Sequence, residues 1–160
     1  MASLNDLKLS HRLFMQAYPF RHVDWSPGTR LKKLLRDSTL TLISTAGLHL
    51  PEHSPFDRGI RAGDCSFREI PVETNIQDLL IGHPSPDFDK TGALEDRNLV
   101  FPLDRLRELA ELGEIGGLSR RHFSFMGGII APGRLINETA PEVAAKLGED
   151  HTDAVLLAPA

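Results

Sequence analysis

The chain has 160 residues, of which 41% are apolar and 25% charged, and its formal net charge is −4. This composition is typical of a globular protein with a hydrophobic core, and it excludes a disordered chain, collagen and a coiled coil. The negative charge disfavours a general nucleic-acid binder. The single cysteine, Cys65, excludes an internal disulfide framework and a zinc site made of several cysteines.

The amino terminus carries polar and charged residues where a signal peptide needs an unbroken apolar stretch, and no apolar run is long enough to span a membrane. We therefore expect a cytoplasmic protein that binds neither membranes nor nucleic acid. Positive charge gathers in residues 1–40, which hold seven Lys or Arg against three Asp or Glu. Residues 1–38 are predicted to form a helical arm whose basic face is either solvated or docks on an acidic partner.

Apolar residues at helical spacing predict a helix over residues 4–18. The Ser-Pro pair at 26–27 and the apolar stripe that follows it predict a second helix, which runs to about residue 36. The β-branched segment 39–44 predicts the first strand. Further strands are predicted at 66–70, 79–81, 122–126 and 153–158, and further helices begin at residue 102 and at the capping box 139–142.

Two polar loops, 47–64 and 84–98, interrupt these elements. Because helices and strands alternate in the second half, residues 39–160 are predicted to form a single α/β domain. We expect a mostly parallel, open sheet of about five strands with helices on both faces, in a three-layer arrangement of the Rossmann or flavodoxin type. The last strand is nearly all apolar, which predicts burial on both faces.

In open α/β sheets, ligands bind beyond the carboxyl ends of the strands. The loops at those ends supply the candidate catalytic residues His49, Asp64 and His83 and the candidate substrate-binding residues Asp57, Arg61, Gly127 and Gly128. A histidine can protonate a leaving amine, and an arginine can bind a carboxylate through two hydrogen bonds.

Each candidate also has an ordinary structural role open to it. Asp64 can cap a turn, Asp57 and Arg61 can form a surface pair, and the glycine pair can form a turn. The histidines can be solvated or internally hydrogen-bonded. His49 and His53 have a spacing that suits metal ligands on a helix, but the intervening proline argues against that, and no metal site is predicted.

A series of short segments occurs in a fixed order from about residue 40 onward. They are Thr45-Ala46-Gly47-Leu48-His49, Pro55-Phe56-Asp57, Gly63-Asp64 with 66–71, Asp96-Arg97-Asn98, 101–106, 123–127 and 154–157. As an ordered set, they resemble the selenoprotein B family, which includes the selenoprotein B subunits of glycine, sarcosine, betaine and D-proline reductases.

The resemblance implies a function. In that family the strand that matches residues 154–158 is followed almost at once by selenocysteine or cysteine. We therefore expect an oxidoreductase subunit that reductively cleaves a C–N bond in a small amine or amino acid, with a disulfide as acceptor. Its selenol or thiol is expected just after Ala160, so that residues 39–160 would lack the C-terminal portion of the domain and be inactive alone.

The same resemblance implies no cofactor within the chain, a pyruvoyl carbonyl on a partner subunit, and other reductase subunits or a second copy as partners. Two alternatives stay open at this point. One is a non-catalytic α/β binding or scaffold subunit of a redox complex, complete at residue 160. The other is a small-ligand binder in which residues 44–47 hold a phosphate; flavin absorbance tests that alternative, and the coding sequence after Ala160 tests the first.

Overall fold

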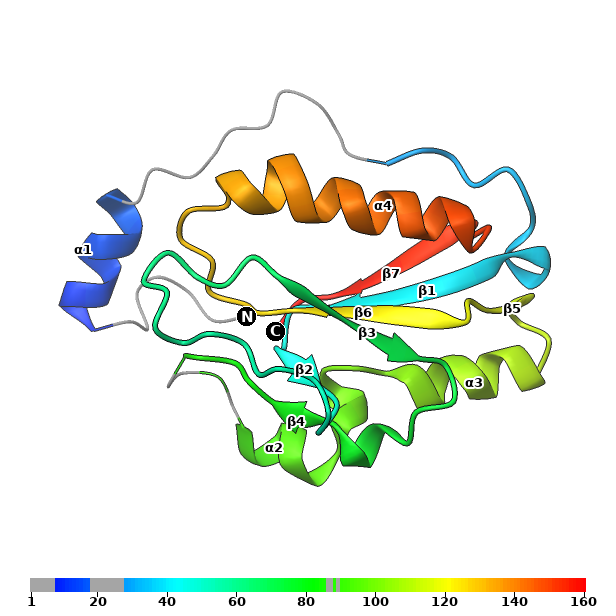
Figure 1. Cartoon of the computed structure of the whole chain (residues 1–160), viewed down its shortest axis with the longest axis horizontal. Coiled ribbons are helices and arrows are strands. Elements are labelled where there is room, and N and C mark those ends of the chain that lie inside the picture. The colour runs from blue at the N-terminus through cyan, green and yellow to red at the C-terminus, as the bar shows by residue number, and fades with distance from the viewer. Residues whose placement is uncertain (1–7, 18–27, 86–87, 89) are drawn as a thin grey trace. The chain divides into compact units, whose positions relative to one another are not determined.

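The structure is a computed structural model that describes residues 8–17, 28–85, 88 and 90–160 (Figure 1). Its residues fall into two compact units, which separate between Arg30 and Leu31. The first unit contains helix α1 (Leu9–Ala17), none of whose residues is buried. The helix predicted over 4–18 therefore begins at Leu9, and its predicted ends at residues 4–7 and 18 lie outside the described residues.

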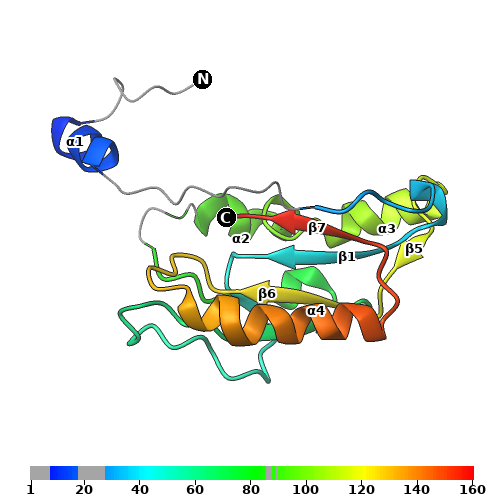
Figure 2. The ribbon, with the colours of Figure 1, turned by 90° about the horizontal axis from the view of Figure 1, so that it is seen from above.

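The second unit is built around the central strand β1 (Thr39–Ser44). Strand β7 (Ala154–Ala158) pairs with it in parallel from Leu40 to Ser44. The opposite edge of β1 pairs in parallel first with β5 (Gly117–Leu118) and then with β6 (Arg121–Phe125). The outer strand β3 (Phe67–Pro71) runs antiparallel to β6. Figure 2 shows β7, β1 and β6 side by side with their carboxyl ends at the same edge.

Two hydrophobic layers cover this sheet, one on each face. On one face, Leu40 and Leu42 of β1 pack against Leu103 and Leu106 of α3 (Leu103–Glu111) in the larger core. On the other face, α4 (Ala140–Glu149) packs through residues such as Val143 against the phenylalanines of β6. Within β1 itself, Leu40 and Leu42 belong to the first core and Ile43 packs against the second. Successive side chains of a strand point to opposite faces, as a strand between two helical layers requires. The predicted α/β class, mostly parallel sheet and three layers are confirmed.

A smaller antiparallel pair lies on the α3 side of the sheet; one of its strands lies within the predicted strand 79–81, whereas the other strand and the pairing were not predicted. It joins β2 (Leu48–His49) to β4 (Leu80–Ile81). The predicted polar loop 84–98 was also wrong in part, because it contains helix α2 (Lys90–Glu95) and a short 3-10 turn at Arg97–Leu99. These short elements are too brief to show a periodicity in the sequence.

Three other local predictions were wrong for identifiable reasons. Residues 28–34 form no helix, and only a 3-10 turn follows at Leu35–Asp37, because the apolar stripe that would anchor a helix is exposed. Thr139 is not a helix cap but the last residue of a π-helical segment, Leu135–Thr139, that continues into α4. Leu157 of β7 is 67% exposed, because among the described strands β7 pairs with β1 alone and α4 packs mainly over β6.

No helix in the described ranges has the length and apolar character needed to cross a bilayer. Within those ranges, no three His, Cys, Asp or Glu side chains gather as they would around a metal ion.

Candidate functional site

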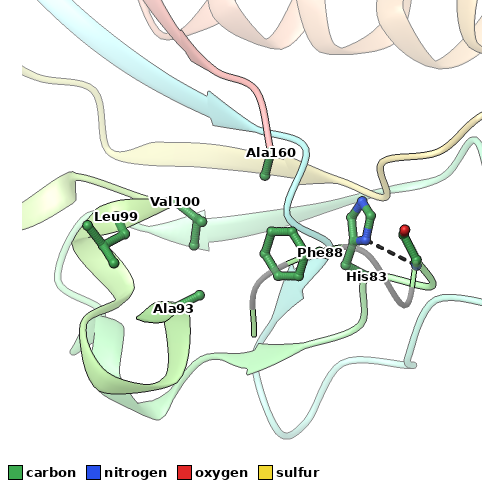
Figure 3. A pocket seen from close by; sticks show the side chains of 7 residues that line it. His83, Phe88, Ala93, Leu99, Val100 and Ala160 are labelled. Carbon is green, nitrogen blue, oxygen red and sulfur yellow. Dashed lines mark hydrogen bonds between the residues drawn. The ribbon is translucent and has the colours of Figure 1, made fainter. Parts of the chain in front are cut away.

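A pocket of about 420 Å³ lies at the carboxyl edge of the sheet, on the side of α2 and α3 (Figure 3). This is the edge at which open parallel sheets bind ligands. Its described lining residues are His83, Ser85, Phe88, Ala93, Leu99, Val100 and Ala160. The side chains of Ala160, Phe88 and His83 lie around the same hollow, so the last residue of the chain and a predicted catalytic histidine share one pocket.

His83 reaches the pocket because two backbones approach each other closely. Gly47 follows β1 with a φ of +68°, and its carbonyl accepts a hydrogen bond of 2.7 Å from the backbone N–H of Gly82. A Cβ on Gly47 would lie 2.8 Å from the backbone nitrogen of His83. Residue 47 must therefore be glycine for both steric and conformational reasons. The contact between the Gly47 and His83 backbones sets the position of His83 just after the end of β4.

The imidazole of His83 is held in one orientation. Its Nδ1 accepts a hydrogen bond of 3.2 Å from the backbone N–H of Ser85, and its ring stacks on Phe88 with the centroids 4.6 Å apart. Burial and then the nearby charge of Lys90 lower the pKa of His83. The neutral ring therefore prevails at pH 7, and because Nδ1 is an acceptor its proton is on Nε2.

The Nε2 atom of His83 is buried and has no hydrogen-bond partner among the described residues. The residue His83 is 4% exposed, so the missing hydrogen bond is not supplied at the surface. Buried donors without a partner are rare in proteins, because each leaves an uncompensated desolvation cost of about 1–3 kcal/mol. The Nε2 atom faces Gly127 beside the pocket, and no described residue accepts its proton.

Gly127 and Gly128 lie behind this histidine and differ in their surroundings. Gly127 is buried, and a Cβ there would overlap Nε2 of His83. Gly128 is exposed and has a φ of +70°. The pair thus gives the imidazole room and turns the chain; the structure brings Gly127, but not Gly128, into contact with the pocket's histidine.

The carboxyl end of β7 is tied to the end of β1 by the side chain of Thr45, a residue that the sequence indicated only as part of the segments 44–47 and 45–49 and not as a site residue. The hydroxyl of Thr45 accepts a hydrogen bond of 2.9 Å from the backbone N–H of Ala160 and donates one of 3.4 Å to its carbonyl oxygen. The position of Thr45, the first residue after the central strand, was the signal that could have indicated it.

The structure keeps Asp57, Asp64 and Arg61 away from the pocket. Asp64 accepts hydrogen bonds from the backbone N–H groups of Asp57 and Ser66 at 2.9 and 2.8 Å, as a turn cap does. Burial would raise the pKa of Asp64, but the hydrogen bonds from Ser66 and Asp57 outweigh it and lower the pKa. Asp57 in turn accepts from the backbone N–H of Gly59 at 2.7 Å, and Arg61 is exposed.

His49 takes part in the packing next to the site. It is buried in β2, its Nδ1 lies 2.9 Å from the carbonyl oxygen of Leu50, and its ring meets Phe56 edge-on. A Cβ on Gly82 would lie 3.5 Å from its Cδ2, so His49 supports the chain just before His83. His49 does not line the pocket among the described residues.

Arg97 is a second residue whose place the sequence analysis did not foresee, although its segment contributed to the resemblance. It is 7% exposed, and its guanidinium donates to the carbonyl oxygens of Leu79 and Ala93 at 3.0 and 2.5 Å. These hydrogen bonds join α2 to the residues before β4. Since Ala93 and Leu99 line the pocket, Arg97 braces one of its walls.

Three backbone donors of the segment 44–47 are engaged within the protein. The N–H groups of Thr45, Ala46 and Gly47 donate to the Ala158 carbonyl, the Ser44 hydroxyl and the Phe125 carbonyl. A phosphate-binding loop needs such N–H groups to point at its anion. The geometry therefore speaks against the phosphate-binding alternative for this segment.

Comparisons with known proteins agree with the ordered segments noted in the sequence. A relative, the D-proline reductase subunit gamma of Acetoanaerobium sticklandii, is 38% identical over 133 residues, which cover 83% of this chain and 52% of the relative. The chain thus spans about half the length of that relative. No solved structure is significantly similar to the chain. Residues 6–160 match the model of the glycine/sarcosine/betaine reductase selenoprotein B family, and the chain belongs to this family.

Proposed function

We propose that this chain forms part of a reductase subunit that cleaves a C–N bond of a small amine or amino acid in the pocket between His83 and Ala160. The nucleophile is a selenol or thiol that follows Ala160 in the full-length protein. One observation carries the proposal: Ala160 lines the same pocket as His83, whose buried Nε2 lacks a partner among the described residues.

A selenol or thiol at that position supplies a nucleophile that bonds to the α-carbon while the C–N bond breaks and the amine leaves with the electron pair and takes up a proton. A dithiol then supplies the two electrons that release the carbon as a C–H product and leave a disulfide. Thiolates, and by extension selenolates, are the reactive forms of these groups. A carbonyl that activates the amine would belong to a partner subunit.

The chain's own residues prepare the site for an anion. Because the pKa of His83 is lowered and its Nδ1 is already an acceptor, the ring offers a neutral Nε2–H as a hydrogen-bond donor. A donor of this kind stabilises a selenolate, a thiolate or a substrate carboxylate at the pocket. This role differs from the protonation of a leaving amine, for which a neutral imidazole is a weak acid.

The remaining wall of the pocket is mainly apolar. Phe88, Ala93 and Val100 line it beside Leu99, and Ala93 is buried. Apolar walls bind the carbon skeleton of a small substrate and strengthen the hydrogen bonds made by the polar groups at its rim. The candidate substrates are therefore small amines and amino acids of the class that reductases of this family reduce.

The test uses the full-length protein, including the residue that follows Ala160, together with its partner subunits. Glycine, sarcosine, betaine and D-proline are each offered with a dithiol, and amine release and thiol oxidation are measured. We expect turnover with one of them, a loss of about 100-fold in His83→Phe, and little change per folded molecule in His122→Gln, a buried histidine outside the pocket.

Two results contradict the proposal. One is a coding sequence in which neither a cysteine nor a recoded stop codon follows Ala160 within a few residues. The other is turnover that His83→Phe leaves unchanged. If the full-length protein binds its partner subunits but reduces none of the four compounds, the alternative of a non-catalytic subunit in a redox complex is favoured.

A further inference from the structure

The carboxyl end of β7 leaves the sheet through a short segment whose hydrogen bonding is unusual. The β1–β7 ladder ends where Ser44 pairs with Ala158, and the backbone N–H of Thr45 makes a last hydrogen bond of 3.2 Å to the Ala158 carbonyl. The next residue, Pro159, has no N–H to donate. The backbone N–H of Ala160 is therefore the first donor after the ladder, and it donates to the Thr45 hydroxyl at 2.9 Å.

Thr45 has the properties of a rigid anchor. It follows β1, which is held on both edges by neighbouring strands, so its backbone is fixed by the centre of the sheet. Its β-branched side chain has a restricted χ1, which limits where the hydroxyl can lie. The hydroxyl also donates to the Ala160 carbonyl at 3.4 Å, so both polar groups of one backbone unit are bound to one side chain.

The backbone of the same residue also lies close to Gly127, the glycine against which His83 packs. A Cβ placed on Gly127 would lie 2.8 Å from the carbonyl oxygen of Thr45, and it would overlap Nε2 of His83. The backbone of Thr45 therefore borders the glycine on which His83 packs, while its side chain holds Ala160. One residue thus relates the end of β7 to the histidine across the pocket.

We propose that Thr45 is a positioning residue: its hydroxyl holds the Ala160 backbone so that the next side chain of the chain enters the pocket facing His83. This inference rests on the proposed function, because it is the redox residue after Ala160 that Thr45 would place. A displacement of about 1 Å at a reacting atom lowers turnover about 100-fold, so the two hydrogen bonds matter beyond their contribution to stability.

The test compares three variants of the full-length protein. Thr45→Val keeps the β-branched shape and removes both hydrogen bonds, and Thr45→Ser restores a hydroxyl. Thr41→Val is the matched control, because Thr41 lies in β1, the strand that Thr45 follows, and its hydroxyl makes a hydrogen bond of 2.8 Å to Thr152 rather than to Ala160. Each variant is examined by amide hydrogen exchange at Ala160, by the pH dependence of alkylation of the redox residue with iodoacetamide, and by turnover.

We expect Thr45→Val to speed exchange at Ala160 at least about 10-fold, to move the alkylation profile toward that of a free selenol or thiol, and to lower kcat at least about 10-fold. Thr45→Ser should stay within about 3-fold of the parent in each measurement, and Thr41→Val should change none of them. A merely structural threonine would instead affect stability in Thr45→Val and Thr41→Val alike and leave the alkylation profile of both unchanged.

The inference is overturned if exchange at Ala160 is the same in Thr45→Val as in the parent. It is also overturned if exchange speeds up while alkylation and kcat stay at the parent's values; the proposed function then stands without it. If the parent itself shows no reactive selenol or thiol after Ala160, the proposed function fails first and the inference fails with it. The parent measurement thus separates the two failures.

Discussion

The imidazole of His83 occupies the space in which any residue other than glycine at position 127 would place its Cβ. His83 follows β4 and Gly127 follows β6, so this contact joins the loops at the ends of two strands that belong to different sheets. The backbone of Gly47, in a third loop, also lies against the backbone of His83. The position of His83 in the pocket therefore depends on its own loop and on the loops that contain Gly127 and Gly47.

Replacement of Gly127 by alanine is expected to lower the free energy of unfolding by about 1–3 kcal/mol, because the new methyl group must displace the His83 ring. Urea denaturation measures the change, and the NMR signals of His83 should shift. Gly148→Ala in α4 is the control: a Cβ at residue 148 would have no atom within 4 Å, so this change should stabilise the protein by about 0.5–1 kcal/mol. Equal effects of the two changes would contradict the packing described for His83.

His83 should remain neutral down to a lower pH than an ordinary histidine. Burial, and then the charge of Lys90, lower its pKa below 6.5, and the Ser85 N–H bound to Nδ1 fixes the proton of the neutral form on Nε2. Nitrogen-15 NMR of the ring, recorded as a function of pH, reports both properties. A ring that is half protonated at or above pH 6.5, or that carries its neutral proton on Nδ1, would contradict this arrangement.

His122 is expected to make the protein acid-sensitive. The ring is fully buried, and its Nδ1 accepts a hydrogen bond of 3.0 Å from the Leu42 N–H at the gap between β5 and β6. Burial, and then the charge of Arg107, lower the pKa of His122 from 6.5 to about 4. The unfolded chain therefore binds more protons than the folded one between these values, so stability falls as pH falls from about 6.5 to 4.

This single group accounts for a loss of about 3 kcal/mol across that window, since the pKa falls from 6.5 to about 4. The measurement is the free energy of unfolding in urea at several pH values for the parent and for His122→Gln, whose amide oxygen can still accept from Leu42 but cannot titrate. Between pH 6.5 and 4, the parent should lose about 3 kcal/mol more of its free energy of unfolding than the variant does. A difference that does not vary with pH would show that His122 does not titrate in this way.

Arg97→Lys is expected to lower the free energy of unfolding by about 1–3 kcal/mol, because an ammonium group cannot reproduce the two directed hydrogen bonds to the Leu79 and Ala93 carbonyls. Arg105→Lys is the matched control: Arg105 is exposed and its ion pair with Glu108 is a surface pair, so the change should stay within about 0.5 kcal/mol. The two variants are compared by urea denaturation, and similar losses in both would show that Arg97 does not brace the pocket.

Local patterns in the sequence predicted the regular elements that the structure confirms. The β-branched segment 39–44 is β1, the alternating segment before Pro71 is β3, and the stripe of leucines after Pro102 is α3. The reason is that these patterns have a period that matches strand or helix geometry and are supported by packing on the core. The ordered segments also indicated the family, which the comparisons confirm.

Elements that depend on distant contacts could not be predicted in the same way. The last strand is as apolar as a strand buried on both faces, yet among the described strands it pairs with β1 alone, and Leu157 is 67% exposed. The leucines of residues 31–35 repeat at helical spacing, yet they remain exposed and no long helix forms there. A pattern shows what a segment can form, but the neighbours that cover it are specified elsewhere in the chain.

In the candidate site, too, some features follow from local sequence and others from contacts between distant residues. The sequence by itself indicated a site beyond the carboxyl ends of the strands and offered His83 as one of its residues, because parallel strands end at a common edge. Only the tertiary structure decided that His83 shares a pocket with Ala160 while Asp64 caps a turn elsewhere, and that Thr45 holds a residue 115 positions away in the chain. The pairing of β1 with β7 brings these two residues together, and strand pairing depends on the whole sheet rather than on either segment.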